Sequence, residues 1–295
     1  MGQGAVLAVP VAAVLGWPLA HTLSPALHQA AYRAAGLDGW SYEARPTRPE
    51  DLAAALEAVR AGGLAGVNLT TPHKQAAAAL VDVLERPADR LRAVNTVFVR
   101  EGRLVGANTD VAGAVWALGS QLGLRDHRWP GTGPAVLLGT GGVALAVAFA
   151  WSRLATARRH QGLPVAPLRV AGRDAANAAA VAGLAGSGAR AVDWADAAEL
   201  VAGADVIVQA TTLTARGEPV PGQGRLRPGV RVLDCNYGPA GQGLVEAALA
   251  AGAAAADGLG MLCAQAAGAV VKIARVRPDL DAMAAAVGLP WPAPA

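Results

Sequence analysis

The sequence predicts an α/β protein made of two domains. Strand-like apolar runs alternate with helical segments along most of the chain, a pattern typical of mostly parallel sheets covered by helices. Near the middle, a strand ending at Leu138 runs into Gly-x-Gly-x-x-Ala and a helix, which indicates the start of a doubly wound domain. With 295 residues, of which 53% are hydrophobic and 16% charged, the chain is long enough to bury two cores.

Composition argues against several classes of protein. The net charge of +3 is small and the arginines are scattered, so we expect no nucleic-acid partner. We also expect a cytoplasmic protein without a membrane partner, because no long apolar run lacks Gly or charge and no signal pattern opens the chain. Cys235 and Cys263 are too few and too far apart for a zinc site, so no metal is expected. The sequence leaves both a monomer and a homodimer open.

The first elements are a strand, a turn and a helix. The first ten residues look like a frayed extension, and Val11 to Gly16 is a short apolar strand. Ser24 is expected to cap the helix, with Pro25 at the first helical position. Thr22 lies two residues before Ser24, so the two hydroxyls and the backbone N–H groups of this turn can hold a carboxylate at the positive end of the helix dipole.

Alternating strands and helices continue from there. We predict a strand near residues 40–44, a helix over 49–60, a central strand over 65–69 and a helix beginning at Pro72. Residues 94–100 and 103–106 then form a hairpin around Glu101-Gly102. A long helix over 111–122 leads into the second domain.

The stretch from Gly66 to Lys74 has the side chains best suited to chemistry. Asn68 and Thr70 lie on one face of a strand end, because strand side chains alternate. Lys74 is one of only two lysines in the chain, and lysine, unlike arginine, can release a proton near neutral pH. Lys74 is therefore a candidate acid or base, although a solvated lysine in the first turn of a helix is the alternative. Asp110, at the end of the hairpin, is either a helix cap or a functional carboxylate.

The second domain has the pattern of a dinucleotide-binding domain. Gly139 permits a tight turn, Gly141 lets a pyrophosphate approach the amino terminus of the helix, and Ala144 allows close packing of helix on strand. Further strands follow at residues 168–172, 189–192, 205–209 and 230–234. An insert over residues 158–167 lengthens the first strand-to-strand link, so the position that discriminates between cofactors falls at Gly172-Arg173-Asp174.

With these motifs placed, the chain resembles the shikimate dehydrogenase family over nearly its full length. The opening signature of the family is found at Gly16 to Gln29, with Thr22 where the family usually has a serine. Further family motifs match residues 66–74, 93–96, 108–113, 234–239 and 258–265.

This resemblance implies the reversible, NADPH-dependent reduction of 3-dehydroshikimate to shikimate, a step toward chorismate and the aromatic amino acids, with NAD as a weaker alternative cofactor. The implied fold has a discontinuous substrate domain, residues 1–112 and 260–295, and a Rossmann-type NADP-binding domain, residues 113–259.

The resemblance also assigns roles to residues. Lys74 and Asp110 are the implied catalytic pair: a protonated Lys74 supplies a proton to the carbonyl oxygen, and Asp110 orients the lysine and the hydroxyl. The implied substrate-binding residues are Thr22, Ser24, Asn68, Thr70, Asn95, Tyr237 and Gln265. The implied cofactor-binding residues are Gly139, Gly141, Gly142, Ala144, Arg173, Asp174 and Gly258.

Alternatives remain open at this point. Quinate oxidation is one, since Thr22 adds a methyl group to the carboxylate turn. A non-catalytic dinucleotide-sensing regulator is another, against which the intact Lys74 and Asp110 argue, and a relative making an amino-substituted ring acid is a third. In the cofactor triplet, Arg173 suits a 2′-phosphate whereas Asp174 suits a ribose hydroxyl. Because water and salt screen an exposed carboxylate, we expect a preference for NADP.

Overall fold

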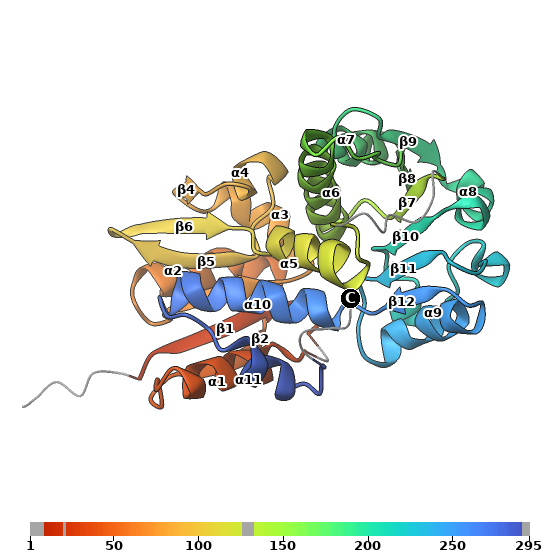
Figure 1. Ribbon diagram of the computed structural model, residues 1–295. Coiled ribbons are helices and arrows are strands. Elements are labelled where there is room, and N and C mark those ends of the chain that lie inside the picture. Colours follow the sequence, from red (N-terminus) through yellow and green to blue (C-terminus); the bar gives the residue numbers. More distant parts are fainter. Residues whose placement is uncertain (1–8, 20–21, 126–132, 291–295) are drawn as a thin grey trace, which may run out of the picture. The chain divides into compact units, whose positions relative to one another are not determined.

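The computed structural model describes residues 9–19, 22–125 and 133–290 (Figure 1). The chain divides into two compact units. The first ends at Thr109 and resumes at Ala266, and the second runs from Asp110 to Gln265. The sequence-based boundaries lie close by, after residues 112 and 259. Of the expected N-terminal extension, residues 1–8 lie outside the described part of the chain, and so does His21 of the opening signature.

The first unit is built on a six-stranded sheet in the order β2-β1-β3-β5-β6-β4. Its strands are β1 (Val11–Gly16), β2 (Ser41–Pro46), β3 (Gly66–Leu69), β4 (Val83–Leu84), β5 (Thr96–Arg100) and β6 (Arg103–Ala107). Strand β1 is parallel to β2 and β3, whereas β5 is antiparallel to both β3 and β6. The predicted hairpin is confirmed: Glu101 and Gly102 both have positive φ, 52° and 72°, which a two-residue turn of this kind requires.

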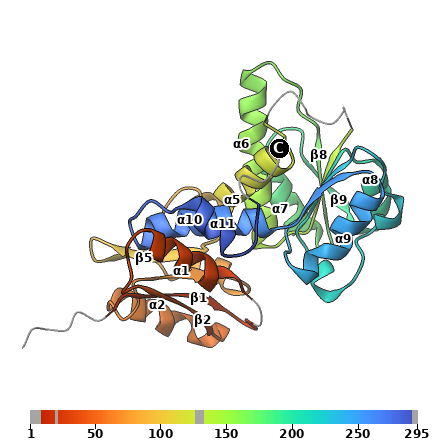
Figure 2. The same ribbon diagram turned by 60° about the horizontal axis from the view of Figure 1, so that its bottom comes forward.

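Helices cover both faces of this sheet (Figure 2). Helix α2 (Leu52–Arg60) packs Leu52, Leu56 and Val59, spaced for one helical face, against inward residues of β1 and β3. The opposite face is covered by α10 (Leu259–Ile273), since a side chain at Gly66 would come within 2.9 Å of Ile273. Asn68 has the same strand parity as Gly66, so it too lies on the α10 face.

Among the remaining helices of the first unit, two are shorter than expected and one was not predicted. Helix α1 (Ser24–Ala34) contacts α11 (Leu280–Ala285). The helix predicted over residues 49–60 is a 3₁₀ turn, η1 (Pro49–Asp51), followed by α2. The helix predicted to begin at Pro72 is a single α turn, α3 (His73–Ala76), followed by the 3₁₀ turn η2 (Ala77–Ala79), and α4 (Ala88–Leu91) was not predicted.

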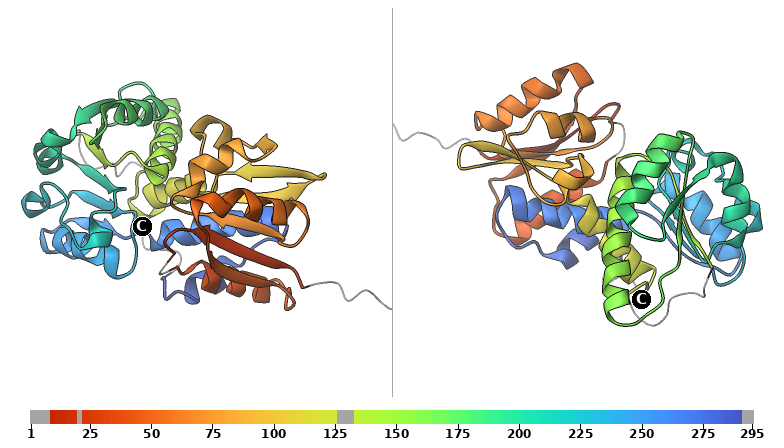
Figure 3. Two further views of the ribbon diagram at one scale, coloured as in Figure 1. Left: turned by 180° about the vertical axis from the view of Figure 1, so that it is seen from behind. Right: turned by 90° about the horizontal axis from the view of Figure 1, so that it is seen from above.

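The second unit has a fully parallel sheet in the order β12-β11-β10-β7-β8-β9 (Figure 3). Its strands are β7 (Ala135–Leu138), β8 (Leu168–Gly172), β9 (Arg190–Asp193), β10 (Val206–Gln209), β11 (Arg231–Asp234) and β12 (Ala254–Ala256). Its helices are α5 (Asp110–Trp116), a π-helical turn η3 (Ala117–Gln121), α6 (Gly142–His160), α7 (Ala175–Ala185), α8 (Ala197–Gly203) and α9 (Pro239–Ala250), with 3₁₀ turns η4 (Trp194–Asp196), η5 (Thr214–Arg216) and η6 (Gln223–Arg225). Strand order reverses between β7 and β10, which is the doubly wound arrangement that the sequence predicts.

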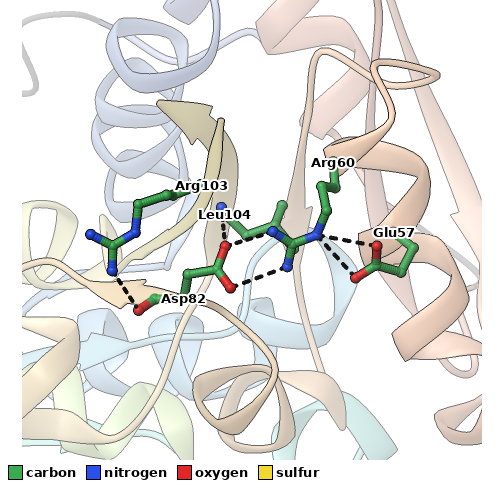
Figure 4. A network of polar contacts seen from close by, with 5 residues as sticks. All are labelled: Glu57, Arg60, Asp82, Arg103 and Leu104. Carbon is green, nitrogen blue, oxygen red and sulfur yellow. Dashed lines mark hydrogen bonds and ion pairs between the residues drawn. The ribbon is translucent and has the colours of Figure 1, made fainter. Parts of the chain in front are cut away.

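Ion pairs hold the edge of the first sheet to its helices. Arg60 of α2 reaches Asp82 at 2.7 Å, and the same carboxylate accepts a hydrogen bond of 2.7 Å from the backbone N–H of Leu104 in β6 (Figure 4). Glu85, just after β4, pairs with both Arg100 and Lys272 at 2.6 Å. Lys272 lies in α10, so the second of the two lysines anchors the C-terminal segment to the sheet.

The Glu85 ion pairs predict an acid-sensitive contribution to stability. Partial burial raises the pKa of Glu85, but the hydrogen bonds from Lys272 and Arg100 outweigh burial and leave the pKa below its ordinary value of 4.5. Such a group stabilises the fold above its unfolded-state pKa, and the contribution is lost as the pH falls through the folded-state value. We expect Glu85→Gln to lower Tm by about 2–4 °C at pH 7, with no difference from the unmodified protein at strongly acidic pH. Scanning calorimetry across pH measures this.

Glu50→Gln is the matched control. Glu50 is an exposed carboxylate whose distance to Arg48 is 3.9 Å, so its removal should leave Tm unchanged at every pH. A Tm difference for Glu85→Gln that does not depend on pH would contradict the assignment to these ion pairs.

Candidate active site

The segment from Ala93 to Thr96 organises the polar residues of the first unit. The backbone N–H of Val94 donates to the carbonyl of Lys74 at 2.7 Å. The carbonyl of Asn95 accepts from Leu69 N at 2.8 Å, and the N–H of Asn95 donates to Ala107 O at 3.0 Å. The end of β3, the end of β6 and helix α3 are therefore tied to one short stretch of backbone.

The side chain of Asn95 fixes the chain immediately before Asp110. Its Oδ1 accepts from Thr109 N at 2.7 Å, and its Nδ2 donates to Thr109 Oγ1 at 2.9 Å. The neighbouring Asn108 donates from Nδ2 to Ala93 O at 2.9 Å. Asn95 is 2% exposed, and a buried amide with these partners resists displacement. The same segment that holds the backbone of Lys74 thus sets the position of Thr109, and Asp110 follows by one peptide bond.

Asn68 is joined to Asn95 and to β2. Tyr42 donates from its hydroxyl to Asn68 Oδ1 at 2.7 Å, and Asn68 Nδ2 donates to Asn95 O at 3.1 Å and Thr96 Oγ1 at 3.0 Å. Burial raises the pKa of Tyr42 well above its ordinary value, with a smaller contribution from Tyr32, so the hydroxyl stays a neutral donor. Both amide hydrogens of Asn68 serve the network, so a substrate would bind to the remaining acceptor capacity of Oδ1.

His28 connects this network to the turn before α1. Its ring stacks on Tyr42 with centroids 3.9 Å apart, and its Nδ1 lies 2.9 Å from Ser24 O. Burial lowers the pKa of His28 to about 4, so the imidazole is neutral at pH 7 and Nδ1 must carry the proton that it donates to the carbonyl. Sequence reasoning missed both His28 and Tyr42 as supports of the site.

The turn at Thr22 and Ser24 differs from the prediction in one respect. Ser24 was expected to cap α1, but it is already the first helical residue, and Leu23 occupies the cap position without a side-chain cap bond. The backbone N–H of Ser24 instead donates to Thr22 Oγ1 at 3.2 Å, and Thr22 Oγ1 donates to Ser24 Oγ at 3.2 Å. With no capping bond to make, the Ser24 hydroxyl can donate to a ligand.

This geometry predicts a binding effect for Ser24→Ala. A hydrogen bond from a hydroxyl to a carboxylate is worth about 1.5–3 kcal/mol, so KM for a carboxylate substrate should rise about tenfold or more while kcat changes less. Steady-state kinetics measures the split. Thr22→Ser keeps both hydroxyls and should leave KM near its original value. A Ser24→Ala enzyme that loses kcat at constant KM would contradict the carboxylate role.

The other predicted substrate residues are placed as follows. Thr70 lies at the end of β3, where its methyl group would overlap any side chain at Gly16. Tyr237 is half-buried after β11, and Gln265 is a buried residue of α10; both belong to the second unit. Within that unit, a side chain at Gly113 would come within 3.1 Å of Gln265 Cβ, so α5 and α10 pack closely there.

The glycine-rich loop of the second unit has the geometry that its sequence predicts. Gly139 has φ of 114°, and a side chain there would lie 2.8 Å from Ala210 O, so only glycine fits. A side chain at Gly141 would meet nothing within 4 Å, and Gly141 is the N-cap of the 19-residue helix α6, which begins at Gly142. Ala144 is fully buried beneath this turn. The loop therefore leaves space for a pyrophosphate at a helix amino terminus.

The cofactor-discriminating triplet shows a role for Asp174 that the sequence reading missed. Asp174 is the N-cap of α7, and its Oδ1 accepts from Asn177 N at 2.7 Å. Arg173 is exposed and makes no hydrogen bond or ion pair with the residues that the structure describes. One carboxylate oxygen of Asp174 is thus occupied locally, whereas the guanidinium of Arg173 is available to a phosphate.

The loop after β11 is held by the buried side chain of Asp234. Asp234 Oδ1 accepts from Asn236 N at 2.9 Å, and burial raises the pKa of this carboxyl group. A side chain at Gly258 would overlap Cys235 O, so only glycine lets the backbone at this position approach the loop after β11 closely. Gly258 N donates a hydrogen bond to Asn236 O at 2.9 Å in this contact. These contacts fix the backbone on which Tyr237 sits.

The described part of the chain contains neither a membrane-spanning helix nor a metal-binding cluster of side chains. No helix there is long and apolar enough to cross a bilayer. No cluster of three or more His, Cys, Asp or Glu side chains suited to a metal ion occurs within residues 9–19, 22–125 and 133–290.

The second unit is doubly wound and has an open glycine loop, and the first unit has a lysine whose backbone is tied to an asparagine network. These features are those of a dinucleotide-dependent oxidoreductase of the α/β class. The family profile described as the shikimate dehydrogenase substrate binding domain matches residues 14–97. A shikimate dehydrogenase (NADP⁺) of Methylocella silvestris is 38% identical over 279 residues, which cover 92% of this chain and 93% of the relative. The chain belongs to the shikimate dehydrogenase family.

Solved structures agree with this assignment. Shikimate 5-dehydrogenase from Thermus thermophilus, in complex with NADP(H) and shikimate, is 36% identical with a TM-score of 0.75, covering 95% of this chain and 98% of that one. Quinate dehydrogenase from Corynebacterium glutamicum, in complex with NAD, is 30% identical with a TM-score of 0.80, covering 94% of this chain and 98% of that one.

Proposed function

We propose that this protein is a shikimate dehydrogenase, which reduces 3-dehydroshikimate to shikimate reversibly with NADPH on the route to chorismate and the aromatic amino acids. One observation carries the proposal: Val94 and Asn95 hold the backbone of Lys74 and that of Thr109, next to Asp110, from a single segment. The names of the relatives and the NADP(H) and shikimate complex of a similar structure support it.

In the proposed reaction, the residues of the chain have the following roles. NADPH, when bound, supplies the hydride. A protonated Lys74 donates a proton to the carbonyl oxygen on which negative charge develops, and Asp110 orients the lysine and the hydroxyl. Thr22 and Ser24 bind the ring carboxylate through neutral hydroxyls. Further hydrogen bonds to the substrate come from Asn68, Thr70, Asn95, Tyr237 and Gln265.

The cofactor is NADP, with NAD as the weaker alternative. The open space at Gly141 and the amino terminus of α6 fit the pyrophosphate, with Gly139, Gly142, Ala144 and Gly258 shaping the adjoining backbone. The available guanidinium of Arg173 fits a 2′-phosphate.

Asp174→Thr should raise the preference for NADP over NAD about two- to fivefold. The change removes an exposed, screened negative charge beside the phosphate position, and a threonine hydroxyl can still cap α7. The ratio of kcat/KM for the two cofactors measures this. Asp174→Asn, which keeps an equally good cap without the charge, should shift the ratio in the same direction. An unmodified enzyme that favours NAD would show that Asp174 outweighs Arg173.

Quinate oxidation is the second candidate. It is favoured by the methyl group of Thr22 in the carboxylate turn and by the similarity to a quinate dehydrogenase. We nevertheless expect a shikimate preference, because the other residues proposed to bind the substrate match those of the family.

A purified-enzyme assay with shikimate and quinate against NADP⁺ and NAD⁺ tests the proposal. We expect the highest kcat/KM for shikimate with NADP⁺. Comparable values for quinate would reassign the enzyme as a dual quinate/shikimate dehydrogenase. Cofactor binding without turnover of either substrate would favour a dinucleotide-sensing regulator.

We further propose that the enzyme works in the cytoplasm, as a monomer or homodimer, without a nucleic-acid partner. The scattered arginines and the small net charge of +3 support the last point. Light scattering coupled to size-exclusion chromatography distinguishes the two oligomeric states.

A further inference from the structure

Thr140, in the glycine-rich loop, lies directly against the end of strand β8. A side chain built on Gly172 would overlap the Thr140 methyl carbon Cγ2 and lie 3.6 Å from Thr140 Cβ. Gly172 is the last residue of β8 and precedes Arg173. The space beside Gly172 is therefore filled from the neighbouring loop by Thr140.

The hydroxyl of Thr140 is available to a ligand. Thr140 is half-buried, and its hydroxyl makes no hydrogen bond to any residue within the described ranges. The hydroxyl is attached to the same Cβ as this methyl group, and that Cβ would lie 3.6 Å from a side chain on Gly172, so the hydroxyl is close to the end of β8. A threonine hydroxyl can donate one hydrogen bond and accept others.

The end of β8 is the part of a doubly wound domain that contacts the adenosine ribose of the cofactor. The residues that contact the 2′ position follow the second strand of the domain, which here is β8. Arg173 offers a charged donor there, but Asp174 has no hydrogen to donate at neutral pH and bonds to Asn177 N as a helix cap. The triplet therefore lacks the hydroxyl donor that a threonine at position 174 would provide.

We propose that Thr140 determines cofactor specificity by donating its hydroxyl to the 2′-phosphate of NADP(H), with Gly172 providing the room that the threonine needs. The inference rests on the proposed function, because it requires that the loop binds a nicotinamide dinucleotide. It assigns the donor missing at Asp174 to a residue 34 positions earlier in the sequence.

Equilibrium binding of NADP⁺ and NAD⁺ to the full-length protein, measured by calorimetry, tests the assignment. Thr140→Val keeps the size and the methyl contact with Gly172 but removes the hydroxyl, so Kd for NADP⁺ should rise about tenfold and Kd for NAD⁺ less than about threefold. Thr140→Ser keeps the hydroxyl and should stay within about threefold for both cofactors. No loss of NADP⁺ affinity in Thr140→Val, or an equal loss for both cofactors, would overturn the proposal.

A second pair of variants tests the packing. Gly172→Asn should weaken both cofactors, because the new side chain collides with Thr140. Thr140→Ala combined with Gly172→Asn should restore the binding of NAD⁺ but leave NADP⁺ about tenfold weaker, because alanine relieves the collision and lacks the hydroxyl. Gly172→Asn binding as tightly as the unmodified protein would show that Thr140 does not fill this space. An unmodified protein that binds neither cofactor refutes the proposed function itself, whereas normal shikimate turnover with an unaffected Thr140→Val refutes only the role of Thr140.

Discussion

Replacing Lys74 with alanine should lower kcat about 10²- to 10⁴-fold while KM for shikimate and Tm stay close to those of the unmodified enzyme. The side chain is only half-buried, and α3 is held through the backbone carbonyl of Lys74, which alanine retains. What alanine removes is the proposed proton donor to the developing oxyanion, and general acids contribute rate factors of this order. Steady-state kinetics and calorimetry on the same preparation measure all three quantities.

The chain has a matched control in its other lysine. Lys272→Ala removes an ion pair with Glu85, so it should lower Tm and leave kcat unchanged, the reverse of the Lys74→Ala result. Lys74→Arg keeps the positive charge but cannot release a proton near neutral pH, and it should be nearly as slow as Lys74→Ala. Near-normal kcat in Lys74→Ala would remove Lys74 from the mechanism.

Asp110→Asn should lower kcat about 10²-fold or more with little change in Tm. Asp110 is 6% exposed and begins α5, where an asparagine supports a helix start as well as an aspartate does. The amide cannot carry the negative charge that we propose keeps a protonated Lys74 oriented, so kcat should fall while Tm stays nearly constant. Kinetics with shikimate and thermal unfolding separate the two effects.

Asp174→Asn is the matched control for this change. Asp174 also lies at the start of a helix, but its side chain caps that helix and it belongs to the cofactor triplet. Its kcat with saturating cofactor should be unchanged. If Asp110→Asn were fully active and less stable, Asp110 would be a helix-start residue without a catalytic role.

Much of the fold follows from local patterns in the sequence. Strands Val11–Gly16 and Leu168–Gly172 have the predicted bounds, because each is a short apolar run ending in glycine. Strand Ala254–Ala256 was missed because three alanines have no strand preference, and it forms only by pairing with β11. Strand Val83–Leu84 is two residues long, too short for any periodicity.

The polar supports of the site were harder to predict, for a different reason. The hydrogen-bonded residues Tyr42 and Asn68 are 26 positions apart in the sequence, and Asn95 and Thr109 are 14 apart. No local sequence pattern predicts either hydrogen bond. Motif spacing identifies residues that share a role, but the choice of partner depends on which strands become neighbours. The hydrogen bond that Thr22 accepts from Ser24 N and the cap role of Asp174 depend in the same way on backbone angles that several sequences could adopt.

The division of the chain also bears on how the protein is made. The second unit is continuous from Asp110 to Gln265, so it is synthesised as one uninterrupted segment. The first unit is interrupted by it and is complete only after the segment from Ala266 onward has been synthesised. Until Ile273 and the helix Leu280–Ala285 have been synthesised, the β3 face at Gly66 and the outer side of α1 lack their apolar cover. Domains tend to fold as units during synthesis, and exposed apolar surface on an unfinished one invites aggregation. The part of the first unit before residue 110 therefore completes its packing only after the segment that follows Gln265 has been synthesised.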